Sequence, residues 1–208
     1  HVNSWNTFLC ARRLLYAINC HNFLDYSIFI PIIVFLESNT IYMKYKFKTK
    51  PYKHQMKALE SSWNKKNFAL FCEMGTGKSK ILLDNISMLY DKGKINAALI
   101  VAPKGVYRNW VEQEIPKHVP DHINCRTFHW VAPSSRTKDD KQMLSQLYDE
   151  TRDPCLTFFV MNVEAFSTGP GMKEAEKFLW AYKCLMAVDE STSIKTPRAQ
   201  RTINISSV

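Results

Sequence analysis

A glycine-rich segment, Cys72-Glu-Met-Gly-Thr-Gly-Lys-Ser79, lies between an apolar run and a helical pattern. Residues 67–72 have the composition of a short buried strand, and residues 78–90 carry apolar side chains at helical spacing. Glycines between such elements allow backbone N–H groups to close around phosphate oxygens at the N-terminus of the helix. The sequence therefore predicts a phosphate-binding loop carried by a strand and a helix.

Two side chains of this loop have the chemistry that a nucleotide requires. A lysine at position 78 reaches the β- and γ-phosphates, and the Ser79 hydroxyl enters the coordination shell of Mg²⁺. The general pattern has glycine where this chain has Cys72, so the match is incomplete, and a glycine-rich turn without a ligand is the alternative. We expect ATP and Mg²⁺ as cofactors, with loop contacts from Met74, Gly75, Thr76, Gly77, Lys78, Ser79 and Lys80.

The rest of the chain alternates between strand and helix patterns. Alternation at this spacing indicates an α/β fold, with a mostly parallel sheet and helices on both faces. Ligands of such sheets bind at the carboxyl ends of the strands, where the glycine-rich loop also lies. Strands are predicted at residues 97–102, 125–129, 155–161 and 184–188, and helices from just after Pro103 to about residue 118 and at residues 139–148 and 172–182.

A pair of carboxylates follows the last predicted strand, in the run Met186-Ala-Val-Asp189-Glu190. Asp189 is a ligand of the type that Mg²⁺ prefers, and Glu190 is placed to take a proton from an attacking water. Two acidic residues after a strand are common, and alone they predict little. With a phosphate-binding loop about 110 residues upstream in the same sheet, we expect Ser79 and Asp189 to hold the metal, and Glu190 and Lys78 to be catalytic.

Residues 1–42 differ in character from the rest of the chain. They hold two cations and two anions, so the formal net charge of +9 lies wholly in residues 43–208. Their most apolar stretch, residues 27–36, is interrupted by Pro31 and is shorter than the ~20 residues that span a bilayer, although a membrane anchor is an alternative. We expect residues 1–42 to be a leader or upstream read-through outside the fold, whose deletion leaves folding and ATP binding intact.

Charge and cysteine content bear on partners and compartment. An excess of lysine and arginine suits a polyanion such as nucleic acid, because each cation near a phosphate releases condensed counterions, although a merely basic surface is the alternative. The six cysteines are scattered, without a C-x-x-C pair or histidines at zinc-ligand spacing. They indicate a reducing compartment and no metal–thiolate site.

Several further segments resemble superfamily-two helicases, and most closely the Swi/Snf-like translocase branch found in phages. Pro51-Tyr-Lys-His-Gln55 looks like the Q motif of that branch, and Glu73–Ser79 looks like its P-loop, which also lacks the first glycine. Residues 99–104, followed by Asn109-Trp110 and Glu114, resemble motif Ia. Residues 160–166 resemble motif Ib, and Asp189-Glu-Ser-Thr192 replaces the familiar Asp-Glu-Ala-His, which puts the usual histidine contact in doubt.

The resemblance covers about residues 50–202 and implies the first RecA-like lobe of a two-lobe helicase or translocase, here residues 43–208, ending before motif III. Gln55 would then contact the adenine edge, for which a side-chain amide offers both a donor and an acceptor. Lys104 and Arg108 would contact the backbone of nucleic acid, above all double-stranded DNA, although solvated surface cations are the alternative. Trp110 is expected in the core rather than as a platform for stacking bases.

The same resemblance implies a second RecA-like lobe with arginine fingers in the full-length protein, in the cytoplasm of a bacterial host, and no membrane partner. This chain alone would then bind ATP but turn over little of it. The alternatives are an RNA helicase or restriction-type motor of the same superfamily, a nucleotide-gated module that never hydrolyses, and a small-molecule kinase. Glu190 argues against the module, and Gln55 with the acidic pair argues against the kinase.

Overall fold

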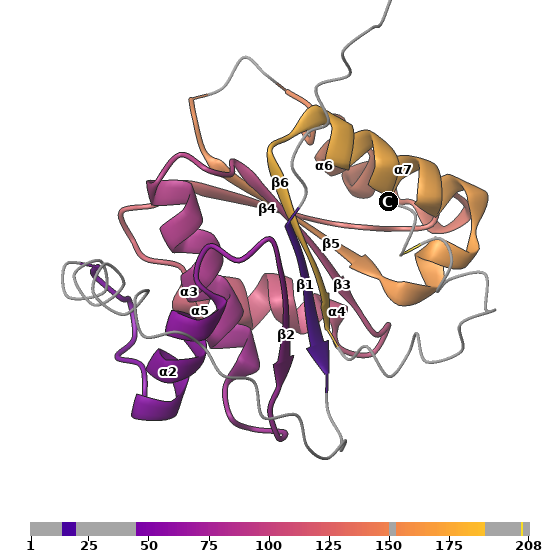
Figure 1. Ribbon diagram of the computed structural model, residues 1–208. Helices are drawn as coiled ribbons and strands as arrows, with labels where there is room; N and C mark the ends of the chain where they lie inside the picture. The colour runs from indigo at the N-terminus through magenta and orange to yellow at the C-terminus, as the bar shows by residue number, and fades with distance from the viewer. Residues whose placement is uncertain (1–13, 20–44, 150–152, 190–204, 206–208) are drawn as a thin grey trace, which may run out of the picture.

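A parallel sheet of six strands lies at the centre of the molecule (Figure 1). The computed structural model describes residues 14–19, 45–149, 153–189 and 205. The strand order is β2-β1-β6-β3-β5-β4, and every neighbouring pair is parallel. The strands are β1 (Leu14–Asn19), β2 (Asn67–Phe71), β3 (Ala97–Ala102), β4 (Cys125–His129), β5 (Leu156–Asn162) and β6 (Cys184–Asp189).

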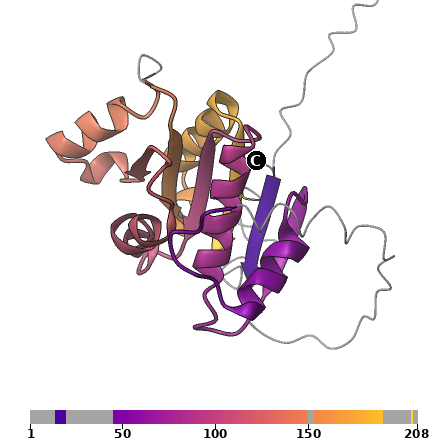
Figure 2. The ribbon, with the colours of Figure 1, turned by 90° about the vertical axis from the view of Figure 1, so that its left-hand side faces the viewer.

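Helices cover both faces of the sheet, as the alternating pattern predicts. Figure 1 shows α3 and α5 on one side and α6 and α7 on the other, and Figure 2 shows α3 lying along its face of the sheet. A π-helical turn, Trp110–Glu114, stands between α4 and α5. The helices are α2 (Lys53–Ser62), α3 (Lys78–Asp91), α4 (Tyr107–Asn109), α5 (Ile115–His118), α6 (Lys138–Ser145) and α7 (Gly169–Ala181).

The core has two layers because successive side chains of a strand point to opposite faces. Ile100 of β3 and Ala187 of β6 pack on the side of α3, whereas Leu99 and Met186 pack on the side of α7. β3 is buried at every residue, as expected of a parallel strand covered on both faces. The prediction of an α/β fold with a parallel sheet and helices on both faces is confirmed.

The strand β1 departs from the expectation that residues 1–42 lie outside the fold. Leu14–Asn19 lies between β2 and β6, in parallel register with both. The physical reason is that β2 and β6 would otherwise each expose a row of unpaired N–H and C=O groups at the centre of the sheet. The remainder of residues 1–42 lies outside the described residues.

The helix predicted between Pro103 and about residue 118 is divided in the structure, and it begins only at Tyr107. Pro116 explains the division, since its ring clashes with the carbonyl four residues earlier and it has no N–H to donate. The π-helical turn immediately before it accommodates the proline. Among the described residues, no helix has both the length and the apolar character that crossing a bilayer requires.

Candidate nucleotide-binding site

The glycine-rich loop connects β2 to α3, as predicted, at the carboxyl edge of the sheet. Gly75 and Gly77 have φ angles of 78° and 81°, in the left-handed region that glycine adopts without strain. Gly77 is also the N-cap residue of α3. Alternating backbone conformations of this kind aim successive N–H groups into a concavity that suits an anion. The backbone of the loop therefore fits a phosphate.

Lys78 extends back across this loop. Its Nζ donates hydrogen bonds to the carbonyl oxygens of Cys72 at 3.2 Å and Glu73 at 2.9 Å. The Thr76 hydroxyl donates to the same Glu73 carbonyl at 2.8 Å, which closes the turn. These bonds place an ammonium group beside the loop backbone, where it can pair with a phosphate.

Gln55 clamps the loop to the start of α2. Its side chain is only 4% exposed, its Oε1 accepts from the Tyr52 N–H at 2.9 Å, and its Nε2 donates to the Thr76 carbonyl at 3.1 Å. His54 Nε2 donates to the same carbonyl at 3.0 Å. A Cβ on Gly77 would lie 2.2 Å from Gln55 Nε2. Gln55 thus positions the loop, a role that the sequence pattern did not reveal, and its contact with adenine stays a prediction.

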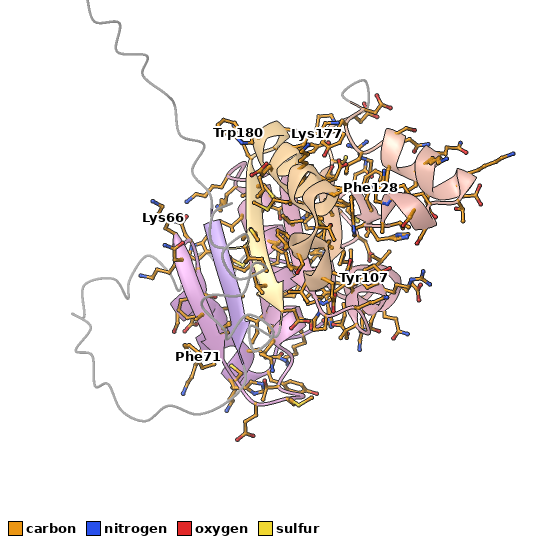
Figure 3. All side chains as sticks on the ribbon, turned by 90° about the vertical axis from the view of Figure 1, so that its right-hand side faces the viewer. Lys66, Phe71, Tyr107, Phe128, Lys177 and Trp180 are labelled. Atoms are coloured by element: carbon orange, nitrogen blue, oxygen red, sulfur yellow. The ribbon has the colours of Figure 1, made fainter. Side chains whose placement is uncertain are left out.

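Three exposed apolar side chains surround the loop. Tyr52 is 70% exposed and its ring stacks on that of His54, with the centroids 5.8 Å apart. Phe71 and Met74 are 73% and 77% exposed. Figure 3 shows Phe71 at the carboxyl end of β2, with Lys66 at the other end of the strand. An apolar rim of this kind suits a planar base above a phosphate-binding loop.

The prediction that Lys80 contacts the nucleotide does not hold for its side chain. Its Nζ forms a buried ion pair with Asp84, one turn further along α3, at 2.7 Å, and lies 5.4 Å from the centre of the Phe47 ring. Burial raises the pKa of Asp84 to about 6, although the Lys80 ammonium opposes the rise. Because the ammonium is held by Asp84, only the backbone N–H of Lys80 is available to the loop.

The carboxylate of Asp189 comes to the α3 face of the sheet. It follows Leu185 and Ala187 at a spacing of two along β6, and both pack on that face. Its Oδ2 accepts a hydrogen bond of 3.0 Å from the buried indole N–H of Trp110. Only β1 separates β6 from β2, so the two strand ends lie about 10 Å apart across the sheet. Glu190 lies outside the described residues.

The donor set fits Mg²⁺ that arrives with a nucleotide. Within the described residues, no group of three or more His, Cys, Asp or Glu side chains could hold a metal by itself. Mg²⁺ retains several waters and binds through one or two carboxylates together with substrate phosphates. Ser79 at the start of α3 and Asp189 at the end of β6 would complete such a shell.

A cavity of about 440 Å³ opens at the carboxyl ends of β3, β4 and β5. Lys104, Tyr107 and Arg108 line it from the segment after β3, Trp130 lines it from the segment after β4, and Asn162 lines it from the end of β5. Lys104 and Arg108 are exposed, and neither forms an ion pair with another described residue. We call this cavity the basic groove.

The acidic side chains that line the basic groove form hydrogen bonds with residues close to them in sequence. Asp140 accepts from the backbone N–H and the hydroxyl of Thr137, both at 2.8 Å, and these bonds lower the pKa of its carboxyl. Glu164 accepts from Asn162 at 2.9 Å. Lys104 and Arg108 therefore remain available for an anionic ligand.

Comparisons with known proteins do not assign this chain to a family. No protein-family model matches the chain, and no curated protein matches it. A solved structure that is similar is the SWI2/SNF2 ATPase core of Sulfolobus solfataricus in complex with dsDNA, with a TM-score of 0.45 and 14% sequence identity. The match covers 77% of this chain but 36% of that chain, so this chain spans about a third of its length. A likeness at this level carries no inference about individual residues.

Proposed function

We propose that this chain is the ATP-binding lobe of a nucleic-acid-dependent ATPase that moves along DNA. The proposal rests on one observation. The loop and the Asp189 carboxylate lie at the same edge of the sheet and on the same face. The loop has two left-handed glycines, and the Lys78 ammonium lies against its carbonyl oxygens. A phosphate cradle beside a carboxylate that can face a metal is the arrangement that phosphoryl transfer requires.

Each residue of the site then has a separate task. The loop N–H groups and Lys78 bind the β- and γ-phosphates, while Ser79 and Asp189 hold the metal. Mg²⁺, when bound, neutralises negative charge on the transferred phosphoryl group. Glu190 accepts the proton of the attacking water. A second RecA-like lobe of the full-length protein supplies arginine fingers, so that the lobe described here binds ATP but turns over little of it.

The basic groove is the proposed contact with nucleic acid. It lies at the same edge of the sheet as the loop, and the segment from Lys104 to Arg108 presents two exposed cations to it. The net charge of +9 adds a long-range attraction for a polyanion. Duplex DNA is the partner we propose, and RNA is the alternative that a binding assay separates.

Salt dependence tests this contact. We expect the logarithm of the affinity for a duplex DNA probe to fall linearly with the logarithm of salt concentration. Replacing both Lys104 and Arg108 by glutamate should flatten that slope by about one to two counterions. Lys92→Glu, a single charge reversal at the far end of α3, is the control for each cation and should leave the slope closer to that of the wild type. An unchanged slope in the double variant, or tighter binding to duplex RNA, would contradict the proposal of a DNA contact in the groove.

A further inference from the structure

The indole of Trp110 is the described side chain that joins the core to the proposed metal carboxylate. Its Nε1–H donates to Asp189 Oδ2 at 3.0 Å, although the two residues are 79 positions apart in the chain. The ring is 1% exposed and packs in the same core layer as Ile100 and Ala187. A donor held this firmly fixes the orientation of the carboxylate that accepts from it.

The backbone of Trp110 belongs to the π-helical turn that precedes α5. The Ile115 N–H donates to the Trp110 carbonyl, a separation of five residues in place of the four of an α-helix. Pro116 follows at once and disfavours a return to α-helical hydrogen bonding through this turn. The position of the indole therefore depends on a local helical register that departs from the α-helix.

The same segment begins in the basic groove. The N–H groups of Val106 and Tyr107 both donate to the Pro103 carbonyl, at 2.9 and 3.0 Å, and the Asn109 N–H donates to Val106 at 2.9 Å. These bonds join residues 103–109, and together with Trp110, which follows directly, we call them the 103–110 unit. Lys104 and Arg108 face the groove at its outer end, and Trp110 contacts Asp189 at its inner end.

We propose that Trp110 is a positioning residue, which orients Asp189 for Mg²⁺ and transmits occupation of the basic groove to the metal site. The inference rests on the proposed function, because it takes the groove and Asp189 to bind a polyanion and Mg²⁺. A polyanion drawn onto Lys104 and Arg108 shifts the 103–110 unit, and the indole moves with it. The Asp189 carboxylate then changes its orientation, so the nucleotide site responds to the groove without any contact between the two ligands.

The first test compares Trp110→Phe with the wild type in the 208-residue chain. Phenylalanine retains most of the ring but has no N–H to donate. We expect the Mg²⁺ concentration that half-saturates binding of a fluorescent ATP analogue to rise about tenfold, since loss of a partner behind a metal ligand costs 10–100-fold in metal affinity. Addition of duplex DNA should alter that concentration in the wild type and not in the variant. Trp63→Phe, which changes another indole that packs against the same core layer, is the control.

The second test needs no nucleotide. The indole ¹H–¹⁵N resonance that disappears in Trp110→Phe belongs to Trp110, and Asp189→Ala should shift that resonance if the hydrogen bond exists. Duplex DNA added to the nucleotide-free protein should also shift it, and replacing Lys104 and Arg108 by glutamate should abolish the shift. The chain has five tryptophans and so five indole resonances. If Trp110→Phe does not fold, the inference is refuted when none of these five resonances shifts on Asp189→Ala.

The two tests separate the inference from the proposed function. Unchanged Mg²⁺ dependence in Trp110→Phe, or an indole resonance that DNA does not move, overturns the role of Trp110 even when ATP binds. Nucleotide binding that survives Lys78→Ala overturns the proposed function, and it does so whether or not the indole resonance responds to DNA.

Discussion

The two glycines of the loop provide a matched pair of substitutions. Both have φ near 80°, so alanine at either position incurs the left-handed backbone strain of about 1–2 kcal/mol. Their surroundings differ, since a Cβ on Gly75 meets nothing within 4 Å, whereas a Cβ on Gly77 lies 2.2 Å from Gln55 Nε2. Gln55 must then move and lose its bonds to Tyr52 and Thr76, at about 1 kcal/mol each. We expect Gly75→Ala to cost about 1–2 kcal/mol and Gly77→Ala about 3–4 kcal/mol.

Urea unfolding followed by circular dichroism measures both free energies. A Gln55→Ala background removes the obstructing amide, so Gly77→Ala should there cost no more than its backbone strain, about 1–2 kcal/mol. The difference between the two backgrounds is the coupling between Gln55 and the loop. Equal costs for the two glycines, or a Gly77 cost that is independent of Gln55, would refute the contact between α2 and the loop.

Two further predictions concern stability. Deleting residues 1–42 removes β1 and leaves β2 and β6 without a shared partner. In contrast to the expectation from sequence, the deletion should abolish cooperative unfolding in a thermal melt, and an unchanged melting temperature would show that β1 is dispensable. Burial, and to a smaller extent the positive charges of Lys80 and Lys117, lower the pKa of His118 from 6.5 to about 4. The unfolded state therefore binds the proton more readily between these values, so the contribution of the neutral imidazole is complete above pH 6.5 and declines as pH falls toward 4. Urea titrations should show His118→Gln flattening this pH dependence by about 2 kcal/mol, and a difference from the wild type that is constant with pH would refute it.

The periodicity of the sequence predicts most of the sheet because strands buried on both faces have a strong local signal. The strand at residues 97–102 begins and ends where its apolar run does, and the strand predicted at residues 125–129 also has the predicted bounds. The sequence does not predict β1 because a short apolar run such as residues 14–19 cannot be told from a buried helical segment by periodicity alone. Its place in the sheet comes from pairing with strands that are distant in sequence, which local patterns do not encode.

In the candidate site too, some residues are predicted from the local sequence, whereas the contacts of others depend on the tertiary structure. The glycines of the loop and the position of Asp189 after a strand are local signals, and both predictions place the residues at one edge of the sheet. The burial of Trp110 was also predicted, and it is confirmed. The hydrogen bond from Trp110 to Asp189 and the clamp of Gln55 on Thr76 depend on tertiary contacts. Because Lys80 follows the loop directly in sequence, it is predicted to contact the nucleotide. In the structure its ammonium pairs with the buried carboxylate of Asp84, one turn further along the helix.

Binding of a fluorescent ATP analogue in the presence of Mg²⁺ tests whether the glycine-rich loop is a nucleotide site. Lys78→Ala removes the ammonium that lies against the loop carbonyls, and we expect the dissociation constant to rise at least about tenfold, equivalent to about 1.4 kcal/mol. Lys92→Ala, at the C-terminal end of the same helix, changes the net charge by the same amount and should leave the dissociation constant unchanged. Undiminished affinity in Lys78→Ala, or equal losses in both variants, would contradict a nucleotide site at this loop.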